Sequence, residues 1–163
     1  MRQPLISDDL RDVLVLQISH EKYNANLYLH IASFLNSKGL SNIAKHFEGQ
    51  FKEEEEHARI IYDLLVDMGL DFPFPAIDGC DMVFGSIGDI AEAYLNREIL
   101  TTESLNEIKE LAMLENPIVE EKMRELILMQ LHEMDEATDF VDKSENLKEW
   151  WQVALWDLSL SGG

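Results

Sequence analysis

The chain has 163 residues, 46% of them hydrophobic, which is enough for one sizeable buried core. Its 32 acidic and 13 basic residues give a formal net charge of −19, and such a field repels nucleic acid and anionic membranes and attracts cations. The single cysteine, Cys80, excludes an internal disulfide and fits a reducing compartment, so we expect a cytoplasmic protein. The sequence shows no N-terminal signal peptide and no apolar run long enough to span a membrane.

The composition, rich in Leu, Glu, Ala, Met and Ile, predicts an all-α fold. With Ser7 as N-cap, a first helix is expected to run to about Lys38, where Gly39 ends it. A second helix is expected from Ser41 to about Met68. Because the break between them is short, these two helices should form an antiparallel pair.

The segment from Leu70 to Gly88 contains two prolines and three glycines among aromatic and aliphatic residues. It is too long for a helix hairpin and too apolar for a floppy linker. It therefore predicts a crossover packed along a four-helix bundle, with the second and third helices parallel. The third helix is expected to open with a capping box at Ser86-x-x-Asp89, and the fourth at Asn116-Pro117.

We therefore predict one domain over residues 1–163, with the bundle over about 7–144 and a short fifth helix over about 147–160. The fifth helix carries three tryptophans and is apolar on more than one side. Two interpretations stay open for it: packing on its own bundle, or burial at a contact between subunits.

Polar residues of metal-ligand type interrupt the apolar stripe of each bundle helix. In the second helix, Glu54-x-x-His57 lies on the same face as its apolar neighbours at steps of three and four. An unpaired buried carboxylate is costly, so such a group is paired, protonated or bound to a metal. The other interruptions are Glu21 in the first helix, Glu98 in the third, and Gln130 with Glu133 in the fourth.

Interruptions at comparable depth in four helices of one bundle predict a common centre in its core. Buried carboxylates a few Å apart cannot all ionise without cations, and two divalent ions would neutralise them. Carboxylate oxygens with one imidazole suit iron or manganese and tolerate zinc. The sequence thus predicts a di-metal site inside the bundle.

The sequence resembles the non-haem, prokaryotic-type ferritins over essentially its whole length. The resemblance rests on Glu21-x-Tyr23 followed by Tyr28, on Glu53-Glu54-x-x-His57, on Asn96-Arg97-Glu98, on Gln130-x-x-Glu133, and on the crossover and the fifth helix. It implies a ferritin-like bundle with ferroxidase activity, which oxidises Fe(II) with O2 or peroxide. It also implies a hollow homo-oligomeric shell of 24 copies that stores the Fe(III) mineral.

By this resemblance, each subunit binds two iron ions at its ferroxidase centre. The first iron would be held by Glu21, Glu54 and His57. The second would be held by Glu54, which bridges the two, together with Glu98 and Glu133.

The resemblance assigns two further residues to the surroundings of the centre. Gln130 would stand near it, where rubrerythrins and bacterioferritins have the first residue of a second Glu-x-x-His. Tyr28 resembles the tyrosine beside the ferroxidase centre. It is expected either to donate an electron or to be a buried aromatic whose hydroxyl binds a carboxylate.

The sequence also departs from the pattern of its relatives. Glu53 and Glu133 match two ligands of a third iron site known in some prokaryotic ferritins, whereas Met129 and His132 replace further carboxylates. Glu55 stands where bacterioferritins have a haem-binding methionine, so no haem is expected. Two alternative functions stay open: a non-catalytic protein that sequesters metal, and a di-iron peroxidase or oxidase of the rubrerythrin type.

Overall fold

The computed structural model describes residues 5–161, and within this range all regular structure is helical. The five helices are α1 (Asp8–Ser37), α2 (Ser41–Asp67), α3 (Ile87–Met113), α4 (Pro117–Ser144) and α5 (Trp150–Ser159). The all-α prediction is therefore confirmed. Residues 1–4 and 162–163 lie outside the described range, so the single domain over 1–163 stays a prediction.

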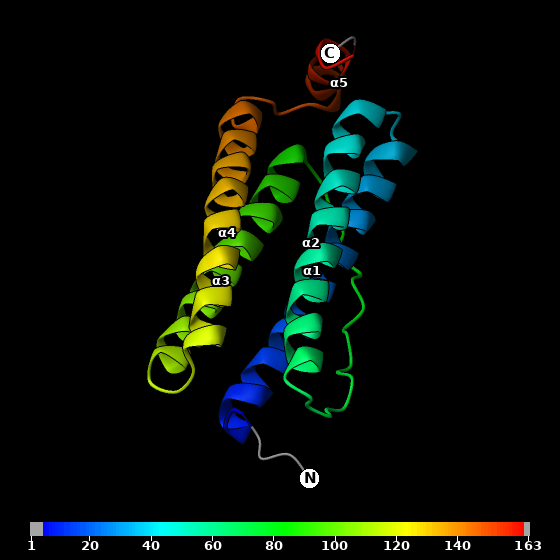
Figure 1. The fold of residues 1–163 in the computed structure, drawn as a ribbon. Helices are drawn as coiled ribbons and strands as arrows, with labels where there is room; N and C mark the ends of the chain where they lie inside the picture. The colour runs from blue at the N-terminus through cyan, green and yellow to red at the C-terminus, as the bar shows by residue number, and fades with distance from the viewer. Residues whose placement is uncertain (1–4, 162–163) are drawn as a thin grey trace.

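The bundle consists of two helical hairpins, α1 with α2 and α3 with α4 (Figure 1). The first hairpin turns at Gly39, whose φ of 76° lies in the left-handed region that favours glycine. Leu40 N donates to Leu35 O at 2.9 Å there, which pairs a carbonyl that the helix end would leave free. The antiparallel pairing of the first two helices is confirmed.

A long crossover joins the two hairpins and returns the chain to the other end of the bundle, so that α2 and α3 run parallel (Figure 1). Residues 70–84 have no regular structure but are attached to α1. Ser19 Oγ donates to Ala76 O at 2.7 Å, and His30 Nε2 lies 2.8 Å from Met82 O. Phe84 is buried at 5% exposure. The predicted crossover along the bundle is thus confirmed.

The predicted N-cap residues of α1, α3 and α4 accept hydrogen bonds from amides in the first turns of these helices. The side chain of Ser7 accepts from Leu10 N, and that of Asn116 accepts from Ile118 N and Val119 N. At α3, Ser86 accepts from Asp89 N as expected, but the Asp89 carboxylate accepts from Gly85 N at 2.7 Å. The reciprocal bond of the capping box is therefore shifted by one residue.

The helix α5 begins at Trp150, three residues later than predicted. The side chain of Gln152 accepts from Lys148 N at 2.8 Å and from Glu149 N at 3.0 Å, so these residues form the cap rather than the first turn. The helix lies across the end of the bundle (Figure 1). One face packs on the bundle and buries Val153, whereas Trp151, Leu155 and Leu158 are exposed at 60–64% on the other.

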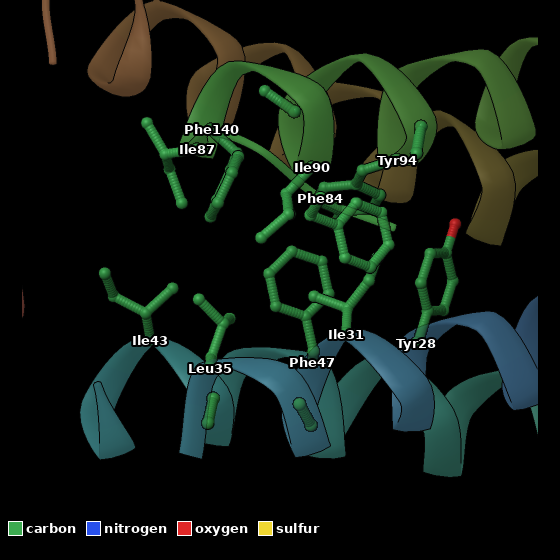
Figure 2. Close-up of a cluster of buried hydrophobic side chains, with 14 of the residues drawn as sticks. Tyr28, Ile31, Leu35, Ile43, Phe47, Phe84, Ile87, Ile90, Tyr94 and Phe140 are labelled. Atoms are coloured by element: carbon green, nitrogen blue, oxygen red, sulfur yellow. The ribbon is translucent and has the colours of Figure 1, made fainter. Parts of the chain in front are cut away.

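The apolar core is divided into two clusters along the bundle. One cluster occupies the end nearest α5 and includes Phe47 and Phe140 (Figure 2). The other occupies the end where α1 begins and includes Leu14 and Leu65. The polar residues singled out from the sequence come from the stretches of chain between these clusters. The fold thus leaves one polar layer in the middle of an otherwise apolar interior.

Candidate metal centre

The four bundle helices each supply a buried glutamate to this polar layer. Glu21, Glu54 and Glu98 are 0% exposed and Glu133 is 2% exposed. His57, one turn after Glu54, is 7% exposed, and Gln130 is 1% exposed. The polar interruptions of the four helical stripes are therefore core residues, and a rotation of α1 that exposes Glu21 is excluded.

The carboxylates and the imidazole form two groups. Within each group, the potential ligand atoms lie within 4.8 Å of one another. One group is Glu21, Glu54 and His57, and the other is Glu54, Glu98 and Glu133. His57 lies between the groups, with Nδ1 3.7 Å from Glu54 Oε2 and Nε2 3.6 Å from Glu133 Oε1. Glu54 belongs to both groups, so its carboxylate can bridge two ions.

Several oxygen atoms of this cluster have no hydrogen-bond partner among the described residues. They are both carboxylate oxygens of Glu54, both of Glu133, and Oε2 of Glu21. Buried polar atoms are nearly always paired, because an unpaired one loses its hydration without compensation. Carboxylate oxygens gathered without partners in a buried core are the donor set that a divalent cation requires, so the residues present fit metal ions.

Burial and mutual repulsion favour the protonated form of Glu54, Glu98 and Glu133 when no metal is bound. Desolvation raises the pKa of Glu54 well above its ordinary value of 4.5, and the neighbouring charge of Glu21 raises it further. Desolvation together with the charges of Glu98 and Glu21 raises the pKa of Glu133 to about 10. The pKa of Glu98 is raised less, to about 7, because Tyr28 and Gln130 donate hydrogen bonds to its charged form.

Neighbouring side chains orient the carboxylates. The Tyr28 hydroxyl donates to Glu98 Oε1, and Gln130 Nε2 donates to Glu98 Oε2 at 2.6 Å. Gln17 Nε2 donates to Glu21 Oε1 at 2.9 Å and is itself only 3% exposed. Sequence reasoning missed Gln17, although its position one turn before Glu21 is a signal that could have found it.

A polar network behind the glutamates ties α1 to α3. Arg97 Nε donates to Asn24 Oδ1 at 2.7 Å, and Asn24 Nδ2 donates to Thr101 Oγ1 at 2.9 Å. His20 Nε2 lies 2.6 Å from the same Thr101 oxygen. Asn24 and Thr101 are fully buried, so their bonds fix the register of two helices that carry site residues.

Glu53 belongs to neither of the two groups. It lines a separate cavity of about 350 Å³ between α2 and α4, together with Glu56, His57, Met129, His132 and Glu133. His132 is 72% exposed, and its Nε2 lies 2.5 Å from Glu136 Oε1 on the solvent side. The structure therefore brings Glu53 next to the centre rather than into it.

The family comparison agrees with this architecture. The sequence model of the ferritin-like domain matches residues 11–147 of the chain. A bacterial non-heme ferritin from Staphylococcus saprophyticus is 32% identical over 108 residues, and one from Staphylococcus aureus is 28% identical over the same length. These matches cover 66% of this chain, and the chain spans 65% of the length of these curated relatives.

Solved structures match almost the whole chain. An open pore ferritin from the hyperthermophilic archaeon Archaeoglobus fulgidus superposes with a TM-score of 0.89 at 27% identity, with 99% of each chain covered. A humanized archaeal ferritin gives a TM-score of 0.89 at 28% identity, with 97% of each chain covered. Within residues 5–161, no helix is long and apolar enough to cross a membrane.

Proposed function

Because the chain belongs to the ferritin-like domain family, we propose that Fe(II) is its substrate and that it is a ferroxidase that stores iron. Two Fe(II) ions bind inside the bundle and transfer electrons to O2 or peroxide, and the Fe(III) product is then stored as a mineral. The iron supplies the redox chemistry, whereas the protein fixes the geometry and excludes water. We place the protein in the cytoplasm.

The observation that carries this proposal is the sharing of Glu54 by two ligand groups. Glu21, Glu54 and His57 hold one Fe(II), and Glu54, Glu98 and Glu133 hold the other. Four carboxylates neutralise two divalent ions, which removes the repulsion that otherwise keeps the glutamates protonated. The carboxyl groups release their protons as the ions enter.

The ligand set also suits a product that must leave. Carboxylate ligands are hard, flexible oxygen donors, so they rearrange more easily than a closed thiolate site. The cavity that adjoins His57 and Glu133 carries Glu53 and Glu56 on its wall and gives a polar path from the centre to the α2–α4 surface. Glu53 contacts iron on this path rather than at the centre.

We further propose that the chain works as a homo-oligomer, with 24 copies as the expected number. Its structural neighbours include an open pore ferritin from Archaeoglobus fulgidus and an engineered closed form of that ferritin. The outer face of α5, with Trp151, Leu155 and Leu158 exposed, supplies apolar surface for a contact between copies.

Oxygen consumption tests the proposed activity. The wild-type protein is expected to consume O2 when Fe(II) is added, and Glu54→Ala is expected to lose the fast phase because both ions lose a ligand. Asp67→Ala, an exposed acid on the same helix and far from the cavity, serves as the matched control and keeps the wild-type rate. Tight Fe(II) binding without any O2 uptake would instead identify a metal-sequestering protein. O2 uptake that requires an organic substrate would identify a di-iron oxidase.

A further inference from the structure

A column of aromatic side chains leads from the metal centre toward α5. Its first member is Tyr28, whose hydroxyl donates to Glu98 Oε1. The edge of the Tyr28 ring meets the Tyr94 ring, with centroids 5.3 Å apart and planes at 77°. Both tyrosines are 0% exposed, and Figure 2 shows them on opposite sides of the core. Two oxidisable phenols are thus in contact inside the bundle, and one of them touches a candidate metal ligand.

The hydroxyl of Tyr94 has one hydrogen-bond partner among the described residues, the imidazole of His46. Tyr94 Oη lies 3.2 Å from His46 Nε2. Burial raises the pKa of Tyr94, so the phenol keeps its proton at neutral pH and donates it. Burial lowers the pKa of His46, opposed by Glu136 and Asp139 and assisted by Lys143, so the imidazole is neutral and accepts. The pair is therefore a phenol donor facing a free base.

The column continues from this pair to the surface. The imidazole of His46 stacks on Phe140 at a centroid distance of 6.0 Å and an angle of 16°. Phe140 in turn packs on Trp156 of α5, with ring centroids 5.3 Å apart. Trp156 and His46 both line a cavity of about 280 Å³, together with charged side chains of α4. The cavity gives a proton on His46 a polar environment to move into, and it brings an oxidisable indole to the partly exposed end of the column.

We propose that Tyr94 and His46 form a proton-coupled electron donor for the metal centre. Tyr28 lies between this pair and the centre, and Trp156 links the pair to the surface. This inference rests on the proposed function, which supplies the oxidant, O2 or peroxide reacting at the centre. One electron leaves Tyr94 through Tyr28, and the phenolic proton moves from Tyr94 Oη to His46 Nε2. The products are a neutral tyrosyl radical and an imidazolium. An electron from Trp156 and the return of the proton restore the pair, and a further Fe(II) ion at the surface gives one electron to the oxidised Trp156 and becomes Fe(III).

Apolar packing alone does not account for these residues. Phenylalanine at position 94 would fill the same space without placing a hydroxyl in the core, and burying a polar group is unfavourable unless it is paired. The half-buried imidazole of His46 pairs with it. The pairing matters chemically because transfer of the proton to a base avoids formation of a protonated phenol radical in a low-dielectric interior.

Freeze-quench electron paramagnetic resonance of the full-length protein tests the proposal. Fe(II)-loaded wild-type protein mixed with O2 is expected to give a tyrosyl signal that narrows when ring-deuterated tyrosine is incorporated. The radical should show a hyperfine coupling to the proton of the imidazolium, and this coupling should disappear when the protein is exchanged into D2O. Tyr94→Phe should abolish this species, and His46→Gln should remove the exchangeable coupling. Tyr62→Phe, a tyrosine packed on Phe72 in the other core cluster, is the matched control and should leave the signal unchanged.

A second experiment tests the column without iron. Photochemical oxidation of the metal-free protein by a ruthenium polypyridyl complex is expected to form a buried tyrosyl radical after oxidation of tryptophan. Trp156→Phe and Tyr94→Phe should reduce its yield, whereas Trp150→Phe should not, because Trp150 lies on the same helix but packs on Phe34, outside the column. Equal yields in all these variants would overturn the proposal. So would normal iron oxidation with the same tyrosyl signal in the wild type and in Tyr94→Phe. Absence of iron oxidation in the wild type would instead contradict the proposed function alone.

Discussion

A proton or a metal ion compensates the buried charge of Glu54, Glu98 and Glu133, and the protein provides few other charge partners. Among basic side chains, His57 reaches the cluster, with Nδ1 3.9 Å from Glu21 Oε2, whereas Arg97 donates to Asn24 and to His20. At 0–2% exposure the four carboxylates lose most of their hydration, which disfavours four simultaneous anions. Protonation of the metal-free centre and proton release on metal binding both follow from this arrangement.

The stability of the metal-free protein is expected to fall as pH rises. The folded-state pKa values of Glu98 and Glu133, about 7 and about 10, lie above the ordinary value of 4.5, so the folded state binds more protons than the unfolded state between these limits. The stabilisation is complete below pH 4.5 and is lost as pH rises through about 7 and then about 10. Thermal melting at several pH values measures it.

A matched pair of variants isolates the contribution of Glu133. Glu133→Gln should flatten the upper part of this pH dependence, while Glu121→Gln, an exposed acid on the same helix, should leave it unchanged. A melting temperature that stays constant or rises over the same pH range would contradict protonated glutamates in the core.

Gln17 is expected to be a positioning residue for Glu21. Gln17→Leu keeps the buried volume but removes the donor at 2.9 Å, and loss of such a supporting bond typically weakens metal binding about 10–100-fold. Anaerobic titration calorimetry with Mn(II) measures the affinity. Gln50→Leu is the control, because Gln50 is equally buried but donates to Glu136 instead. Equal affinities in the two variants would show that Gln17 only fills space.

At the scale of the elements, α5 does more than cover the end of the bundle. The N-cap residue of α2, Leu40, has no side chain that can cap the helix. Asp157 of α5 supplies the cap, since its Oδ1 accepts from Ile43 N at 2.7 Å while Asn42 Nδ2 donates to the Asp157 carbonyl at 3.1 Å. A carboxylate at this end also interacts favourably with the helix dipole. The C-terminal helix therefore stabilises the helix that carries Glu54 and His57.

Asp157→Ala is expected to lower the free energy of unfolding by about 2 kcal/mol, the upper range for loss of a helix N-cap. Asp157 is 4% exposed, so water does not replace the lost bond. Chemical denaturation measures the change, with Asp142→Ala, exposed on α4, as control. A variant as stable as this control would mean that the contact is incidental.

The limits of sequence reasoning are visible in these same elements. Glu54 and His57 were predictable because polar residues interrupt an apolar stripe of fixed period. Gln17 was not singled out, because one amide between apolar residues leaves the periodicity intact. The late start of α5 depends on the side chain of Gln152, which competes for the amides of the first turn. The Asp157 cap joins residues 114 positions apart and has no local signal.

At the scale of the whole molecule, the two open interpretations of α5 are compatible. Val153 and Trp156 pack on the bundle, while Trp151, Leu155 and Leu158 remain exposed at 60–64%. A ten-residue helix with three large apolar residues exposed is unusual for a monomer with a net charge of −19. Contact with another copy would bury this face.

Leu155→Glu combined with Leu158→Glu is therefore expected to dissociate the assembly. The added charges would have to be buried without partners at the contact, which is strongly unfavourable. Light scattering coupled to size-exclusion chromatography measures the mass. Fe(II)-dependent O2 consumption should persist, because the ligand residues precede α5, whereas iron should precipitate without a closed shell. An unchanged mass would assign this face to another role.

The most direct test of a two-ion centre is an anaerobic Fe(II) titration of the metal-free protein, followed by calorimetry. The wild-type chain is expected to bind two Fe(II) ions per subunit with proton release. Glu54→Ala should weaken both sites, whereas Glu21→Ala should weaken mainly one, because Glu54 belongs to both ligand groups and Glu21 to one. Binding of a single ion by the wild type, or equal affinities in the wild type and Glu54→Ala, would contradict a di-iron centre bridged by Glu54.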